Sequence, residues 1–146
     1  MSKNFGHDLI RVEQIPKGEP FVMLPRELIC SKAWRERSIN CIRLIDFLIV
    51  EHLNHAGKEN GYLLATYDQL VKAGIGRRFV HPAITEAERL ELIHVERGGR
   101  RGFASPANKF TLTFLIAKQL GHDGNYYYSK PTNNWKKLDK DEGAKK

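Results

Sequence analysis

The chain has 146 residues and a hydrophobic share of 41%, which fit one globular domain with its own core. Its formal net charge of +7 points to a polyanionic partner or an anionic surface. Cys30 and Cys41 lie eleven positions apart with no CxxC pair, which argues against a disulfide framework and against a zinc site.

The positive charge is unevenly distributed. Residues 1–65 carry nine basic and eight acidic side chains, residues 66–115 carry eight and five, and residues 116–146 carry seven and four. The excess therefore lies in the middle and the C-terminal part of the chain, and these parts are the first candidates for binding an anionic partner.

The first 65 residues predict an arm, a single helical turn and one long helix. Residues 1–20 show little pattern, and Ser31 can cap a helical turn that carries Trp34, which we expect to fill the core. Ser38 is the expected cap of the longest helix, from Ile39 to about His55. That helix is apolar on several sides, so it is either the central helix of the fold or has one face against a second subunit.

A short helix is predicted next. Residues 62–65 resemble a strand, and Thr66 and Gln69 have the spacing of a capping box, so a helix begins there. Gly74 and Gly76 end it after about two turns, because glycine tolerates the left-handed conformation of a helix end.

A second amphipathic helix follows the glycines. Its predicted buried stripe is Val80, Ala83, Ile84, Ala87 and Leu90. The opposite side carries Arg78, His81, Thr85 and Arg89. Since Pro82 lacks an amide hydrogen, we expect an irregular or tight start over residues 77–80 and a regular helix from about Phe79 or His81 to Leu90.

Two alternating segments then predict a hairpin. Residues 92–97 and 109–114 have the period of strands, and the glycine-rich residues 98–102 predict the turn between them. Four basic residues surround its tip: Arg97, Arg100, Arg101 and Lys109.

Residues 121–146 predict a flexible tail, because lysine, asparagine, glycine and aspartate dominate them. The alternative is that Tyr126 to Trp135 fold back over the domain and only the last ten residues are free. Tyrosines interleaved with lysines are also what a single-stranded nucleic acid binder uses.

The order of these elements from Thr66 to Leu115 resembles the winged helix-turn-helix domains of bacterial, phage and plasmid regulators and replication proteins. The resemblance implies an α+β, mainly α, fold with about three to four helices and a small antiparallel β-hairpin wing. It implies a domain over residues 21–120, preceded by the arm and followed by the basic, aromatic-containing tail. In that family the second helix enters the major groove, the wing contacts the backbone or minor groove, and a preceding strand pairs with the wing.

We therefore expect a sequence-specific protein that binds double-stranded DNA, as a transcriptional regulator or a replication-initiation factor. The major groove admits one helix, and phosphates flank it on both sides. The expected DNA-binding residues are Arg77, Arg78, His81, Thr85, Arg89, Arg97, Arg100, Arg101 and Lys109.

Two other functions stay open. The acidic residues Glu86, Glu88 and Glu91 would repel phosphate if they faced the duplex, which favours a protein-interaction module on the same scaffold. The tyrosine-containing tail favours a single-stranded nucleic acid or RNA binder.

Other classes of function lack a signal in the sequence. No nucleophile, base or metal constellation is recognisable, so we expect no enzymatic activity, no cofactor, no metal and no small-molecule ligand. No signal peptide or membrane-spanning run is visible, so we expect a cytoplasmic, bacterial nucleoid-associated protein with no membrane partner. A homodimer is an open alternative.

Overall fold

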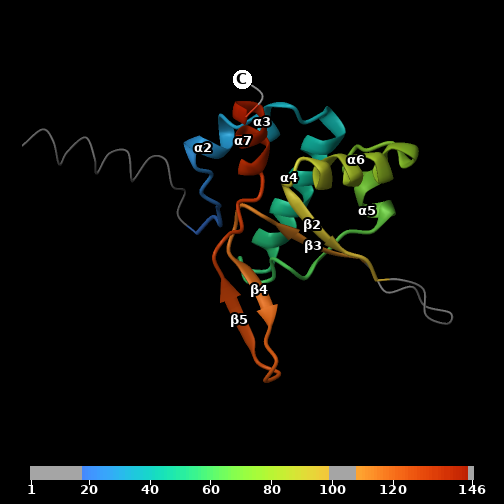
Figure 1. Cartoon of the computed structure of the whole chain (residues 1–146). Coiled ribbons are helices and arrows are strands. Elements are labelled where there is room, and N and C mark those ends of the chain that lie inside the picture. Colours follow the sequence, from blue (N-terminus) through green and yellow to red (C-terminus); the bar gives the residue numbers. More distant parts are fainter. Residues whose placement is uncertain (1–17, 99–107, 145–146) are drawn as a thin grey trace, which may run out of the picture.

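The computed structural model describes residues 18–98 and 108–144 (Figure 1). In these ranges the fold is α+β, with six helices and two small antiparallel sheets. The helices are α2 (Arg26–Ile29), α3 (Lys32–Arg35), α4 (Ile39–Asn54), α5 (Tyr67–Lys72), α6 (Arg77–Arg89) and α7 (Lys136–Ala144). The strands are β1 (Leu63–Leu64), β2 (Ile93–Glu96), β3 (Lys109–Leu112), β4 (Ala117–Leu120) and β5 (Tyr126–Ser129). None of the described helices is both long and apolar enough to cross a bilayer.

Helix α4 is the centre of the core. It begins where the sequence predicts, because the Ser38 side chain accepts a hydrogen bond from the Cys41 amide. Leu44, Ile45 and Leu48 are fully buried, and α4 contacts α6, β1 and β3. Helix α4 is therefore the central helix that the sequence predicts, but its fully buried residues share one broad face, since Val50 on the opposite side is 53% exposed.

Helices α5 and α6 follow each other across a short turn and pack together. Thr66 and Gln69 complete the predicted capping box at the start of α5. The expectation that the regular helix begins only at about Phe79 or His81 is wrong, because α6 is helical from Arg77 with Pro82 inside it, although its first turn is tight. The Phe79 amide bonds to the Gly76 carbonyl at 2.8 Å and tightens the first turn. Pro82 and Arg78 are exposed, so water can satisfy the Arg78 carbonyl that the proline leaves without a helical partner.

The first sheet has the strand order β1-β3-β2 and packs one face on the core. Leu63 pairs with Phe110, and Val95 pairs with Phe110 from the other side; all three are buried. The expected pairing of a strand near residue 63 with the hairpin is confirmed. The expected hairpin tip, with Arg100 and Arg101, lies outside the described residues.

The C-terminal part of the chain corrects the prediction of a flexible tail. Strand β5 pairs with β4, so a domain boundary at residue 120 would cut through this hairpin. Trp135 is 1% exposed within the core, and α7 packs on α3 with the Asp139 carboxylate accepting the Lys32 amide at 3.0 Å. One large buried aromatic side chain can anchor a segment that is otherwise polar, and the overall composition of the segment conceals that anchor.

Asn60 joins the two sheets. Its side-chain amide donates to the carbonyls of Leu112, Leu115 and Ile116, and its oxygen accepts the Leu112 amide at 2.7 Å. The Asn60 carbonyl also accepts the Lys118 amide at 2.7 Å. Asn60 is 1% exposed, so this network fixes the path of the chain from β3 into β4.

Candidate nucleic-acid interface

The outer face of α6 carries four of the predicted residues. Arg78, His81, Thr85 and Arg89 are all exposed, whereas Val80, Ala83, Ile84 and Ala87 are buried on the opposite face. On a helix of 3.6 residues per turn, Arg78, Thr85 and Arg89 fall close to one line. Arg78 also lies over the Phe79 ring, 4.7 Å from its centroid.

Arg77 has a role different from the other arginines of α6. Its guanidinium pairs with the Asp68 carboxylate in the first turn of α5. This hydrogen bond holds the pKa of Asp68 below its ordinary value. Arg77 therefore links the two helices, and its side chain is 62% exposed.

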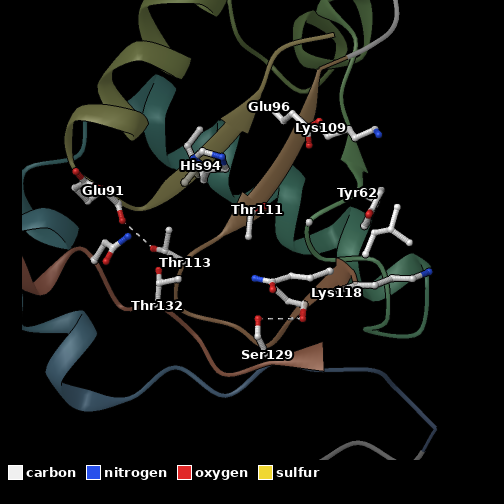
Figure 2. Close-up of a pocket in the computed structure, with 16 residues that line it drawn as sticks. Tyr62, Glu91, His94, Glu96, Lys109, Thr111, Thr113, Lys118, Ser129 and Thr132 are labelled. Atoms are coloured by element: carbon white, nitrogen blue, oxygen red, sulfur yellow. Dashed lines mark hydrogen bonds between the residues drawn. The ribbon is translucent and has the colours of Figure 1, made fainter. Parts of the chain in front are cut away.

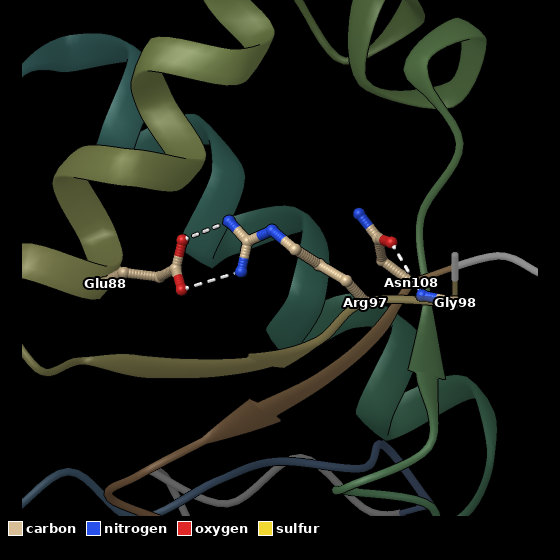
Figure 3. A network of polar contacts seen from close by, with 4 residues as sticks. All are labelled: Glu88, Arg97, Gly98 and Asn108. Carbon is tan, nitrogen blue, oxygen red and sulfur yellow. Dashed lines mark hydrogen bonds and ion pairs between the residues drawn. The ribbon is translucent and has the colours of Figure 1, made fainter. Parts of the chain in front are cut away.

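The acidic residues of α6 lie on the flanks of the outer face. The Glu86 carboxylate accepts the Ser38 amide at 2.7 Å, at the start of α4. The Glu88 carboxylate accepts hydrogen bonds from two guanidinium nitrogens of Arg97, at 2.7 and 3.1 Å (Figure 3). Glu91 follows the helix with φ 59°. The carboxylates of Glu86 and Glu88 are thus paired with other groups of the chain, which reduces the repulsion that the sequence predicts.

Arg97 connects the hairpin to α6. Its hydrogen bond lowers the pKa of Glu88, and the charges of His94 and His81 act in the same direction. The Gly98 amide donates to the Asn108 side chain at 3.2 Å and closes the base of the hairpin (Figure 3). Arg97 keeps 51% of its side chain exposed, so the pair lies at the surface beside the outer face of α6.

Lys109 lies on a different surface from Arg97. Successive side chains of a strand point to opposite faces, and Lys109 pairs in register with Glu96 on the face away from the core. Its ammonium is 5.0 Å from the centroid of the Tyr62 ring. The structure therefore gathers Arg78, His81, Thr85, Arg89 and Arg97 and separates Lys109 from them.

Sequence reasoning missed the outer surface of the β1-β3-β2 sheet. A cleft of about 590 Å³ lies between this sheet and the β4–β5 hairpin (Figure 2). Tyr62, His94 and Thr111 line it from the first sheet, and Lys118 and Ser129 line it from the second. The signal available in the sequence was Asn60-Gly61, whose turn brings Tyr62 beside Lys118.

A comparison of the chain with protein-family models, curated proteins and solved structures finds no match.

Proposed function

We propose that this protein binds double-stranded DNA through a winged helix-turn-helix, with α6 in the major groove and the β2–β3 hairpin as the wing. The order of α5, turn, α6 and hairpin supports this assignment, as does the third strand β1 beside β3. The observation that carries it is the outer face of α6, which is exposed and presents two arginines, a histidine and a threonine. The acidic side chains of that helix point to its flanks.

The dimensions of α6 suit this role. Thirteen residues give a helix about 20 Å long, and its diameter of about 10–12 Å matches a major groove about 12 Å wide. Arg78 and Arg89 lie near opposite ends of this length, so each can reach guanine O6 and N7 or a phosphate. Thr85 and His81 lie between them and can contact base edges.

The proposal assigns different roles to the cations. Arg78 reads bases, whereas Arg97 lies beside the helix, where release from Glu88 would let it contact phosphate. Arg77 positions α6 against α5 through Asp68. Such a domain would serve a transcriptional regulator or a replication-initiation factor.

The test begins with selection of bound sites from a random duplex pool by the full chain. Arg78→Ala is then expected to cost about 1–3 kcal/mol on the selected site and little on random duplex. Arg35→Ala is the matched control, because Arg35 is an exposed helical arginine on α3. A symmetric selected site would report a homodimer.

The proposal fails if Arg78→Ala and Arg89→Ala, both folded by circular dichroism, bind the selected duplex as tightly as the unchanged protein. A chain that ignores duplex DNA even at low salt would instead favour a protein-interaction module on this scaffold.

A further inference from the structure

The β4–β5 hairpin projects from the body of the protein (Figure 1), and its β5 strand exposes aromatic side chains. Tyr126, Tyr127 and Tyr128 are 53%, 52% and 56% exposed. Because strand side chains alternate, Tyr126 and Tyr128 share one face and Tyr127 lies on the other. Tyr127 donates its hydroxyl hydrogen to the Asp123 carboxylate within the hairpin.

The face of Tyr126 and Tyr128 continues onto the first sheet. We call this the tyrosine-lysine surface, and it consists of Tyr62, Lys109, Lys118, Tyr126 and Tyr128. The Lys118 ammonium is 4.4 Å from the Tyr126 centroid and 5.8 Å from the Tyr62 centroid. The Tyr62 and Tyr126 rings meet edge to face at 5.8 Å, so the two sheets form one surface.

This surface is held in place by the backbone. The Lys118 amide donates to the Asn60 carbonyl, and Gly61 lies so close that a Cβ there would be 2.6 Å from the Lys118 carbonyl oxygen. The Tyr128 hydroxyl donates to the Lys58 carbonyl at 3.3 Å. The rings are therefore preorganised, which lowers the entropic cost of binding a ligand on them.

We propose that the tyrosine-lysine surface binds single-stranded nucleic acid, with bases stacked on Tyr126 and Tyr128 and phosphates at Lys109 and Lys118. Bases stack on any aromatic ring, and lysines beside the rings follow the backbone. Tyr126 and Tyr128 are two residues apart on an antiparallel strand, about 6.8 Å, which is twice the rise of about 3.4 Å per stacked base.

The composition favours a nucleic acid over a protein partner. Cores of protein interfaces are enriched in tyrosine but depleted in lysine, whereas here two lysines lie against the exposed rings. Glu59 neutralises part of the charge through its ion pair with Lys118 at 2.9 Å, and Lys109 adds a second cation. This site is separate from the outer face of α6, so it does not depend on duplex binding.

The test measures fluorescence anisotropy of a labelled oligo(dT) of about twelve nucleotides, within the range of known single-strand site sizes, with the full chain. Tyr126→Ala and Tyr128→Ala are each expected to weaken binding about 5- to 160-fold, the effect of losing one stacked base. Tyr127→Ala is the matched control, equally exposed on the other face of the hairpin, and is expected to bind within about twofold of the unchanged chain.

Two further variants separate stacking from loss of folding. Tyr126→Phe and Tyr128→Phe keep the rings and are expected to retain binding. Arg78→Ala is expected to lose duplex affinity and keep oligo(dT) affinity, so the proposal for α6 and the proposal for the tyrosine-lysine surface are tested independently. Absence of oligo(dT) binding by the unchanged chain, or equal losses for Tyr127→Ala and Tyr126→Ala, would overturn the proposal.

Discussion

Neutralising Glu88 is expected to strengthen duplex binding, although the residue lies in the helix proposed to enter the groove. The Glu88→Gln substitution removes a negative charge and releases the guanidinium of Arg97 from its bidentate pair. Arg97 is 51% exposed, so its guanidinium, no longer paired with a carboxylate, can then bind a phosphate.

The magnitude follows from counterion release. One additional phosphate contact steepens the slope of log affinity against log salt concentration by about 0.9. When the salt is diluted fourfold, the affinity of Glu88→Gln is therefore expected to rise by a factor about 3.5 times larger than the rise for the unchanged protein. The effect on folding is smaller. The pair is at the surface, with side chains 51% and 30% exposed, and such pairs contribute about 0.2–1 kcal/mol.

The assay is a salt titration of duplex binding, with unfolding in urea as a check on stability. Glu36→Gln is the matched control, because Glu36 also forms a surface pair, with Lys32 at 3.9 Å, but on the exposed side of α3. It removes the same charge without releasing an arginine beside α6. The double variant Glu88→Gln/Arg97→Ala is expected to lose the additional slope.

A lower duplex affinity for Glu88→Gln, with its urea midpoint unchanged, would refute this reasoning. It would mean that the pair holds the hairpin in a binding geometry and that Arg97 makes no phosphate contact of its own. An unchanged slope with unchanged affinity would remove Arg97 from the interface.

Other predictions concern stability and reactivity. Trp135→Ala is expected to lower the free energy of unfolding, measured in urea, by about 3–5 kcal/mol, because it empties a buried aromatic site. A loss below about 1 kcal/mol would mean that residues 136–144 form a loose tail. The Arg97 hydrogen bond lowers the pKa of Glu88 below 4.5, so the stability that Glu88 contributes is present above pH 4.5 and is lost as the pH falls through the folded pKa. The difference in unfolding free energy between the unchanged chain and Glu88→Gln is expected to shrink over that range. Burial raises the pKa of Cys41 to about 12, so a thiol reagent is expected to modify exposed Cys30 rapidly and Cys41 only after unfolding, with mass spectrometry as the readout.

Local signals predicted where α4 and α5 begin. Ser38 and Thr66 each bond to an amide three residues ahead, so the cap depends only on neighbouring residues. The buried stripe of α6 from Val80 to Ala87 follows from period alone, and its exposed face was predicted with it. Pro82 disturbs α6 less than the sequence predicts, because at an exposed position it removes only one helical hydrogen bond.

The pairing of β4 with β5 could not be predicted. Ala117–Leu120 is short and does not alternate, so β4 has no strand signal of its own and forms through its partner Tyr126–Ser129. Only the alternative in which Tyr126 to Trp135 fold back over the domain anticipates the position of Trp135, which is the largest fully buried side chain of the described residues. The polar composition of this region then indicated a tail where the structure has a hairpin and a helix.

The candidate site was predicted only in part, because some of its contacts also join residues that are far apart in the chain. The face of α6 is a property of one helix, whereas the Glu88–Arg97 pair depends on the turn after Leu90, where Glu91 adopts φ 59°. A residue other than glycine is uncommon at positive φ, and no residue type in this turn predicts that conformation. The link from Arg77 to Asp68 likewise depends on how α6 crosses α5.

The two proposed surfaces meet at one hairpin, and strand geometry explains how it serves both. Arg97 follows the outward-facing Glu96 and so points back toward α6, while Lys109 opposite Glu96 points outward to Tyr62. A shift of β2 by one residue against β3 would move Arg97 to the tyrosine-lysine surface, while Lys109 stays in place because β3 also pairs with β1. The buried Val95–Phe110 pair opposes such a shift, because the shift would expose Val95, and the register therefore keeps the two proposed surfaces on separate faces.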